Sequence, residues 1–270
     1  MNPVHNSAAA GYSAAAQTYA SGRPDYPAEA LDWLREVVRL APGKTVLDLG
    51  AGTGKFLPLL KQSGARVQAV EPVAAMREEL ARRHSDVEAL PGTADNIPLP
   101  DNSLDAVVCA QSFHWFATPA ALAGIRRVLV PGGILGLIWN VRDTTVPWVA
   151  ELSKIIDPFE QGTPRYATGE WRRLFPAEGF HELAERTAPN PQAGPAEQVL
   201  VERTLSVSFI AALPPAAKQR VEDRVRALIA DTPELADHPQ VTFPYQTHMF
   251  AFQTSVPLDQ SSALDRGGVA

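Results

Sequence analysis

The sequence has very little cysteine, no long apolar run and no excess of positive charge. Its single cysteine, Cys109, cannot form a disulfide within the chain or build a cysteine-based metal cluster. No apolar run approaches the roughly 18 residues that a membrane-spanning helix needs. The formal net charge is -6, whereas nucleic-acid phosphates are bound by a basic face. We therefore expect no metal, no nucleic-acid partner and no membrane contact.

We also expect no signal peptide at the N-terminus. Residues 1–5 do not show the basic and then apolar pattern of a signal peptide. Together with the single cysteine, this favours the reducing cytoplasm. The 270 residues, of which 45% are hydrophobic, can bury a full core, either as one large domain or as one domain with a subdomain.

Three glycines at alternate positions, Gly50, Gly52 and Gly54, follow the apolar run 45–49. Such a run is typical of a buried strand, and glycine lets a ligand approach the backbone closely. Apolar residues return with helical spacing from residue 56, so the free N–H groups of a helix would face the ligand. The pattern is typical of a nucleotide-type pocket, although an ordinary glycine-rich turn would share it.

Strands and helices alternate over the first half of the chain. We expect strands at 45–49, 66–70, 87–90, 104–110 and 134–140, and helices at 28–40, from 56, at 73–84 and at 118–128. Beyond residue 145 the alternation lapses. Here we expect helices at 146–160 and 215–230, a loop at 189–195, a strand at 180–187, and a last strand at 247–252 on a sheet edge.

Polar residues follow the predicted strands at their carboxyl ends, where open α/β sheets bind ligands. Glu71 ends the second strand and can accept both hydroxyl hydrogens of a ribose. Asp95 follows the third strand, where it would accept from an adenine amine or simply form a turn. Met76 would lie on a purine face or fill the core.

The ends of the fourth and fifth strands carry a second group of polar and aromatic residues. We predict that six of them contact the substrate: Phe113, His114, Trp115, Trp139, Asn140 and Arg142. His114 is the candidate general base. The alternatives are a hydrogen-bonded structural role for His114, a structural cap for Asn140, and a surface ion pair of Arg142 with Asp143.

Residues 1–27 are predicted to form a lid. Tyr12 and Tyr19 share one face of a helix expected at 7–20. The connector 23–27 cannot be helical throughout, because each of its prolines disfavours helix in the preceding residue. The segment would either close over the pocket, with Tyr12 facing the substrate, or simply cover the sheet.

These segments, in this order, resemble the class I S-adenosylmethionine-dependent methyltransferases, and within them the small-molecule group that includes trans-aconitate methyltransferase-like proteins. The resemblance covers about residues 10–255 and rests on four segments: Asp48 to Gly54, Glu71 with Asp95, Tyr19-x-x-x-Arg23-Pro24-x-Tyr26-Pro27, and Gln111 to Phe116. It implies an α/β, Rossmann-like fold with a seven-stranded, mostly parallel sheet, helices on both faces, an antiparallel last strand and an N-terminal helical lid.

We divide the chain accordingly. Residues 1–27 would be the lid and 28–256 the methyltransferase domain, with a partly helical, substrate-side region at 145–246; residues 257–270 would be a flexible tail.

The resemblance also implies S-adenosylmethionine as the cofactor and assigns residues to it by position. Gly50 and Gly52 would let its methionine portion pass close to the backbone, Asp48 would orient its amine, and Glu71 would hold its ribose. The other residues assigned to the cofactor site are Tyr19 and Arg23 at its carboxylate, Ala94 and Asp95 at the adenine edge, Met76 on the adenine face, and Ala51, Pro72 and Gln111.

The expected function is in-line methyl transfer to an oxygen, nitrogen or carbon of a small-molecule acceptor, by a cytoplasmic monomer or homodimer. A non-catalytic S-adenosylmethionine-binding scaffold and a methyltransferase of protein or RNA are the alternatives. A dehydrogenase would share the glycine turn and the ribose carboxylate. Its dinucleotide motif is G-x-G-x-x-G, however, whereas the spacing here is G-x-G-x-G.

Overall fold

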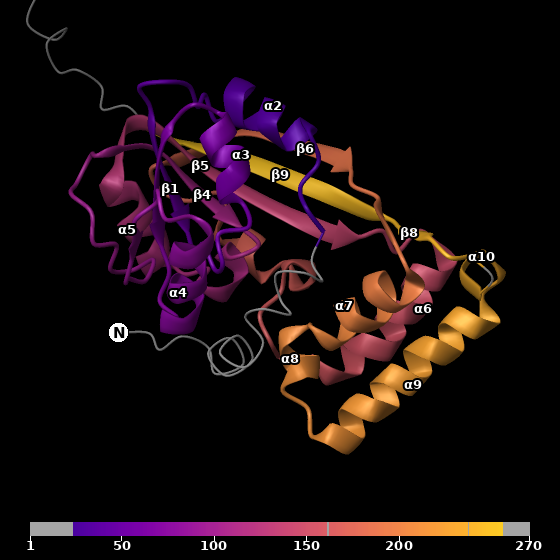
Figure 1. Cartoon of the computed structure of the whole chain (residues 1–270). Coiled ribbons are helices and arrows are strands. Elements are labelled where there is room, and N and C mark those ends of the chain that lie inside the picture. Colours follow the sequence, from indigo (N-terminus) through magenta and orange to yellow (C-terminus); the bar gives the residue numbers. More distant parts are fainter. Residues whose placement is uncertain (1–23, 161, 237, 256–270) are drawn as a thin grey trace, which may run out of the picture.

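A seven-stranded sheet forms the centre of the protein in a computed structural model, which describes residues 24–160, 162–236 and 238–255 (Figure 1). In chain order its strands are β1 (Thr45–Leu49), β2 (Arg66–Val70), β3 (Ala89–Leu90), β4 (Leu104–Ala110), β5 (Leu129–Arg142), β6 (Phe180–Pro189) and β9 (Tyr245–Thr254). Their order in the sheet is β3-β2-β1-β4-β5-β9-β6. Strand β9 pairs antiparallel with both β5 and β6, and β1 to β5 pair parallel. The predicted fold class is confirmed.

Helices cover both faces of the sheet because neighbouring residues of a strand point to opposite sides. Val46 lies in a core cluster with residues of α2 (Glu29–Glu36), α3 (Leu57–Gln62) and α4 (Ala74–Arg83). The next residue, Leu47, lies in a second cluster with residues of α5 (Pro119–Val128). Both positions are fully buried, so both faces of the sheet are covered, as is usual for parallel sheets.

The last strand does not lie on a sheet edge, so this prediction was wrong. Strand β9 is inserted between β5 and β6, and β6 forms the edge. The physical reason is burial on both faces: Met249, Phe250, Ala251 and Phe252 are all buried in β9. An apolar run of this kind belongs inside a sheet, whereas the exposed Glu182, Glu185 and Arg186 suit the edge strand β6.

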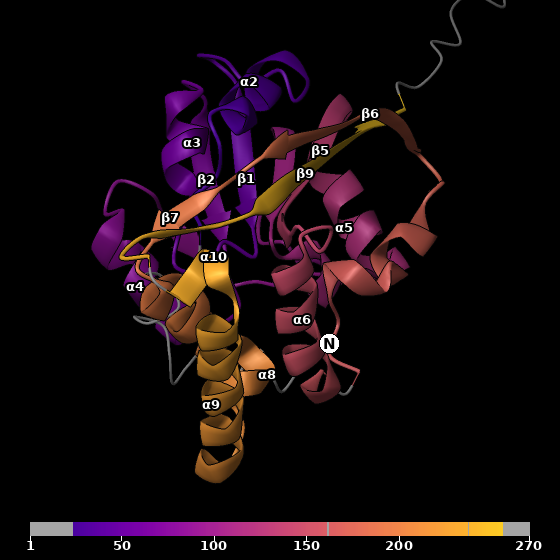
Figure 2. The same cartoon turned by 90° about the vertical axis from the view of Figure 1, so that its right-hand side faces the viewer.

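A group of helices stands beside the sheet and has a core of its own. It contains α6 (Pro147–Ile156), a π-helical turn (Glu197–Glu202), α7 (Arg203–Leu205), α8 (Ser208–Ala211), α9 (Pro215–Asp231) and α10 (Pro233–Ala236). Their buried residues form a third cluster, distinct from the two on the sheet. Both views show these helices projecting from one end of the sheet, next to the end of β5 (Figures 1 and 2).

The helical region lies within the predicted range 145–246, but its details differ from expectation. The predicted loop 189–195 contains β7 (Gln192–Gly194), which pairs with β8 (Val241–Phe243) in a separate two-stranded sheet. No described helix is both long and apolar enough to cross a membrane. The predicted lid helix at 7–20 and the tail at 257–270 lie outside the described residues.

Candidate cofactor and acceptor site

The glycine turn after β1 packs against the end of β4 at Gly50 and, among the described residues, is open at Gly52. Gly50 and Gly52 have φ angles of 72° and 57°, in the left-handed region that favours glycine. A Cβ on Gly50 would lie 2.7 Å from the Cβ of Ser112, so the end of β4 lies directly against the turn. A Cβ on Gly52 would meet no atom of the described residues within 4 Å. The N–H of Ala51 donates a 3.2 Å hydrogen bond to the carbonyl of Val70 at the end of β2.

Glu71 is fixed at the end of β2, beside this turn. One of its carboxylate oxygens accepts from the N–H of Gly52 at 2.9 Å, and the other accepts from the N–H of Val73 at 2.9 Å. Burial raises the pKa of Glu71 above its ordinary value, and the two backbone N–H groups oppose that rise. Each carboxylate oxygen can accept more than one hydrogen bond, so Glu71 retains the capacity to bind a diol.

Asp48 is a buried carboxylate for which the described residues supply no hydrogen bond. Its side chain in β1 is 1% exposed, and neither carboxylate oxygen has a partner there. Burial, with the nearby charge of Glu71, raises the pKa of Asp48 to about 8. Leaving a buried carboxylate without a partner is costly. A ligand ammonium group beside Asp48 would remove that cost, so the site fits a cationic amine.

The residues predicted to hold adenine lie after β3 and in α4. Ala94 is buried, and Asp95 is exposed with one carboxylate oxygen accepting from the hydroxyl of Thr93 at 2.6 Å. That contact stabilises a turn, which was the alternative for Asp95. Met76 is buried in α4, and Pro72 is half-buried just before that helix. Contact of these residues with adenine stays a prediction.

The end of β4 carries a strained residue and a hydrogen bond that the sequence did not predict. Gln111 has a φ of 59°, which is rare for a residue other than glycine and is common at functional sites. Its side-chain amide donates to the carbonyl of Asn140 at 3.3 Å. The hydroxyl of Ser112 donates to the carbonyl of Leu49 at 2.7 Å and so joins the ends of β4 and β1.

His114 accepts a hydrogen bond that argues against its predicted role as a base. The indole N–H of Trp139, which can only donate, lies 3.0 Å from Nδ1 of His114. The bond uses the Nδ1 lone pair, so the neutral imidazole carries its proton on Nε2. Accepting a proton at Nδ1 would require this bond to break. The geometry therefore favours the structural alternative for His114.

Two of the predicted substrate contacts are instead part of the core. Trp139 is fully buried, with its ring centroid 4.6 Å from that of Trp171. Phe113 is also fully buried and has ring contacts with Phe116 and Phe175. Neither side chain lines the cavity described below. Aromatic residues at the end of a strand can therefore serve the core alone.

Asn140 has a structural role, as the alternative proposed. Its side-chain oxygen accepts from the hydroxyl of Thr247 at 2.6 Å and from the amide of Asn190 at 3.0 Å. The amides of Asn140 and Asn190 both donate to the carbonyl of Asp25, at 3.2 and 2.7 Å. Asn190, which the sequence analysis did not identify, thus holds the connector that precedes α2 through the carbonyl of Asp25.

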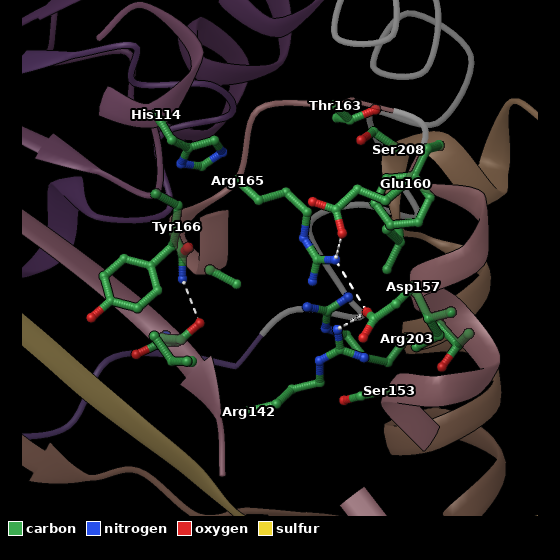
Figure 3. Close-up of a pocket in the computed structure, with 18 of the residues that line it drawn as sticks. His114, Arg142, Ser153, Asp157, Glu160, Thr163, Arg165, Tyr166, Arg203 and Ser208 are labelled. Carbon is green, nitrogen blue, oxygen red and sulfur yellow. Dashed lines mark hydrogen bonds and ion pairs between the residues drawn. The ribbon is translucent and has the colours of Figure 1, made fainter. Parts of the chain in front are cut away.

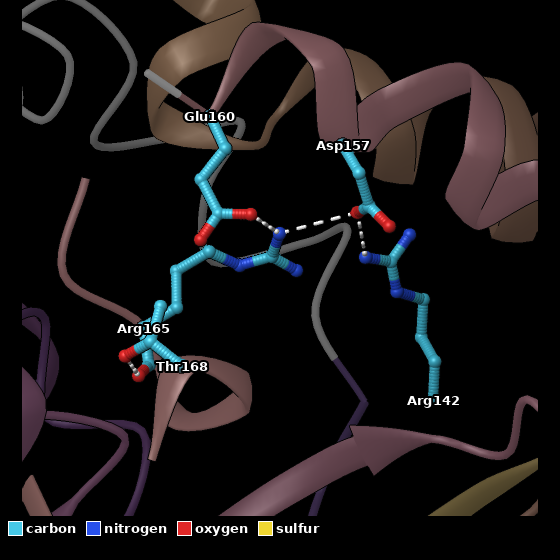
Figure 4. A network of polar contacts seen from close by, with 5 residues as sticks. All are labelled: Arg142, Asp157, Glu160, Arg165 and Thr168. Atoms are coloured by element: carbon cyan, nitrogen blue, oxygen red, sulfur yellow. Dashed lines mark hydrogen bonds and ion pairs between the residues drawn. The ribbon is translucent and has the colours of Figure 1, made fainter. Parts of the chain in front are cut away.

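Arg142, a predicted substrate contact, forms an ion pair with Asp157 and not with Asp143, the partner that the structural alternative named. Its guanidinium lies 3.7 Å from Asp157 (Figure 4). The carboxylate of Asp143 instead accepts from Thr145 and Gln246, and these bonds lower its pKa, with the Thr145 hydroxyl the largest cause. The arginine thereby faces the helical region.

A cavity of about 310 Å³ lies between the end of β5, the 3-10 turn η1 (Phe113–Trp115) and helices α6, α7 and α8 (Figure 3). Its size is at the lower end of the range for small-molecule pockets. Five predicted site residues line it: Gln111, His114, Trp115, Asn140 and Arg142. The sequence analysis missed the residues that complete it, which include Ser153, Asp157, Glu160, Arg165, Tyr166, Arg203 and Tyr245. No motif in the sequence distinguishes these residues from ordinary positions in helices, strands and loops.

The glycine turn and the cavity meet at two adjacent residues. Ser112 lies against Gly50, and Gln111 lines the cavity. A ligand at the turn and a ligand in the cavity would therefore be neighbours. Three predicted site residues, Tyr12, Tyr19 and Arg23, lie outside the described part of the chain.

Comparison with known proteins identifies the family. The family model for a methyltransferase domain matches residues 47–137. An uncharacterised methyltransferase-like protein of Schizosaccharomyces pombe is 37% identical over 236 residues, which cover 86% of this chain and 91% of that protein. An uncharacterised methyltransferase of Mycobacterium tuberculosis is 39% identical over 236 residues, covering 87% of this chain and 92% of that protein.

Solved structures agree on the fold. A structure from Anaeromyxobacter dehalogenans, assigned as a type II methyltransferase, superposes with a TM-score of 0.66 at 21% identity and covers 87% of this chain and 99% of its own. The sheet with its inserted antiparallel strand and the full-length relatives lead to one conclusion: the chain belongs to the class I S-adenosylmethionine-dependent methyltransferases.

Proposed function

We propose that this methyltransferase binds S-adenosylmethionine at the glycine turn and methylates a small molecule held in the adjoining cavity. The observation that carries the proposal is Asp48, a buried carboxylate without a hydrogen-bond partner in the described chain, next to the open face of Gly52. Asp48 would hold the cofactor amine, Gly50 and Gly52 would line its methionine portion, and Glu71 would hold its ribose.

The bound cofactor supplies an activated methyl group, and transfer yields the methylated acceptor and S-adenosylhomocysteine. The protein has to hold the accepting atom in line with the methyl group at roughly 3 Å. Gln111 and Ser112 would fix the end of β4 between the two ligands, because each is bonded to the end of a different neighbouring strand. If the acceptor carries a proton, the bond from Trp139 to His114 makes another group or solvent the proton acceptor.

A small molecule suits this site better than a macromolecule. The cavity of about 310 Å³ has the size of a small-molecule pocket. Residues of the helical region line it on the side away from the sheet. The formal net charge of -6 is unfavourable for RNA. A non-catalytic scaffold would not need an acceptor cavity beside the glycine turn.

The test is to incubate the protein with methyl-labelled S-adenosylmethionine and a cell extract that has been separated into low-mass and macromolecular fractions. We expect protein-dependent label in a low-mass product, identified by mass spectrometry. Label confined to protein or RNA would overturn the small-molecule proposal. Calorimetry that shows cofactor binding, combined with no labelled product in either fraction, would favour the scaffold.

A further inference from the structure

The charged side chains that line the cavity interact with one another. Arg165 lies 3.3 Å from Asp157 and 2.8 Å from Glu160, and Arg142 lies 3.7 Å from Asp157 (Figure 4). These two arginines and two carboxylates therefore form one chain of ion pairs whose charges balance. Arg203, the third arginine of the lining, also has interaction partners within the protein. The charged part of the lining thus does not require a charged ligand.

Two buried hydroxyl groups of the lining differ from these charged groups, because neither has a hydrogen-bond partner in the described part of the chain. They belong to Ser153, which is 8% exposed, and Tyr245, which is 2% exposed. Buried hydroxyls without partners are rare in proteins, since each can both donate and accept a hydrogen bond. A ligand in the cavity would supply the missing partner.

The elements that carry the two hydroxyls place them at the same end of the cavity. Tyr245 pairs directly with Arg142 across β9 and β5, so the two side chains leave the same face of the sheet. Arg142 reaches Asp157, and Ser153 lies one helical turn before Asp157 at the end of α6. In Figure 3 the hydroxyl of Ser153 points toward Arg142. Ser153 and Tyr245 therefore both lie near Arg142.

The core of the helical region holds both side chains in place. The ring of Tyr245 stacks on that of Phe243 with a centroid distance of 4.5 Å. Ser153 lies on α6 next to Leu152, which is buried in the same core as Tyr245. Hydroxyls that are positioned before the ligand arrives lose little conformational entropy on binding, so their hydrogen bonds contribute to affinity and to orientation.

The hydroxyl end and the sheet end of the cavity are separate. In Figure 3, His114 lies on the opposite side of the cavity from Ser153. Apolar side chains contribute to the lining: Leu152, Ile156, Val207, Phe209 and Phe243. A ligand group beside Ser153 would therefore be remote from the cofactor, which adjoins Gln111, and an apolar body would extend between the two ends.

We propose that the acceptor is an uncharged molecule with an apolar body, and that Ser153 and Tyr245 bind a hydroxyl or carbonyl oxygen of it that is remote from the methylated atom. The inference rests on the proposed function. A neutral oxygen can accept from both hydroxyls, whereas burying a further charge beside a balanced chain of ion pairs is costly. Ser153 and Tyr245 thus select and orient the acceptor and take no part in the transfer itself.

The proposal fixes the charge of the product. In the transfer, a bond forms between the methyl carbon and the accepting atom, and the bond from that carbon to the cofactor sulfur breaks. The accepting atom loses its proton to solvent or to another group. An uncharged acceptor therefore yields an uncharged product, which still carries the oxygen that Ser153 and Tyr245 bind.

The first test measures that charge. Protein, methyl-labelled cofactor and low-mass extract are incubated, and the product is partitioned between an organic solvent and either dilute acid or aqueous bicarbonate. We expect the label in the solvent in both cases, and mass-spectrometric fragments that retain an unmethylated hydroxyl or carbonyl group. Label in the bicarbonate, label in the acid, or a product without such an oxygen would overturn the inference and leave the proposed function intact. If cofactor binds but no product is labelled, the proposed function itself fails.

The second test removes each hydroxyl and compares the result with a matched control outside the cavity. Ser153→Ala and Tyr245→Phe should each raise the extract concentration needed for half-maximal labelling by roughly three- to tenfold, the effect of one neutral hydrogen bond. Ser103→Ala removes a hydroxyl that donates to the carbonyl of Pro100 at 2.7 Å in an exposed turn, and should leave that concentration unchanged. All three variants should bind S-adenosylhomocysteine as the unaltered protein does.

Melting temperatures exclude a purely structural explanation. Because no described group bonds either hydroxyl, Ser153→Ala and Tyr245→Phe should melt at or above the temperature of the unaltered protein. Lower melting temperatures in both variants would mean that the hydroxyls form bonds within the protein, and would overturn the inference. Unchanged half-maximal concentrations in both variants would overturn it as well.

Discussion

Asp48→Asn should stabilise the ligand-free protein and weaken cofactor binding. The substitution keeps the size of the side chain and removes its ability to ionise. The folded protein raises the pKa of Asp48 from 3.8 to about 8. Because a tenfold change in an equilibrium is worth about 1.4 kcal/mol, this rise costs the unaltered protein about 4 kcal/mol of stability at pH 7.

The raised pKa of Asp48 makes the stability of the folded protein depend on pH. Between pH 3.8 and about 8, the folded state binds a proton at Asp48 that the unfolded state has lost. The stability of the unaltered protein should therefore fall as pH rises through this window. Urea unfolding should show similar stabilities for the unaltered protein and the variant near pH 4. Near pH 8 the variant should be more stable, by at most about 5 kcal/mol.

Cofactor binding should show the opposite preference. An ammonium group beside Asp48 favours the ionised carboxylate, so binding at pH 7 should release close to one proton from the unaltered protein. Calorimetry in buffers of different ionisation enthalpy measures that proton. Asp48→Asn should release none and should bind S-adenosylhomocysteine at least tenfold more weakly, since a hydrogen bond to a charged group contributes about 1.5–3 kcal/mol. A variant that is less stable at pH 8, with unchanged affinity, would refute the reasoning.

Three further substitutions, one of them paired with a control, test the site. Glu71→Ala should lower cofactor affinity at least tenfold in calorimetry while circular dichroism shows the fold intact, because two charge-assisted bonds of about 1.5–3 kcal/mol each are removed; unchanged affinity would place the ribose elsewhere. Gly52→Ala and its control Gly43→Ala should each lose roughly 1–2 kcal/mol of stability, since both glycines have positive φ and room for a Cβ. Only Gly52→Ala should also weaken cofactor binding. His114→Asn should keep methyl transfer within tenfold, whereas a hundredfold loss of kcat would indicate a base, which contributes about 10²–10⁴-fold.

The glycine turn and the carboxylate beside it, which we propose as the cofactor half of the site, could be located from the sequence because they are built from short stretches of chain. A strand that ends in Gly50 and Gly52 allows few conformations, and Glu71 follows from the parallel strand beside it. Each feature depends on its neighbours in sequence. Strand β9 shows the limit of this reasoning, because its place between β5 and β6 depends on a partner strand far away in the sequence.

The acceptor half could not be predicted, because it is assembled from distant segments. Ser153 and Tyr245 face one cavity only after the helical region has packed beside β9. Arg203 and Glu160 have the sequence context of ordinary surface charges. The same limit explains His114, since no periodicity shows that the indole of Trp139 donates to it.

Gln111 and Ser112, where the glycine turn meets the cavity, would allow the proposed acceptor cavity to vary while the proposed cofactor site stays fixed. The hydroxyl of Ser112 donates to the end of β1 at 2.7 Å, and the side-chain amide of Gln111 donates to the end of β5 at 3.3 Å. Both bonds go to backbone carbonyls of the sheet, so neither depends on side chains of the helical region. Substitutions in α6, α7 or α8 can therefore reshape the cavity without moving Gly50. In-line transfer requires such constancy, because a displacement of about 1 Å can cost a hundredfold in rate.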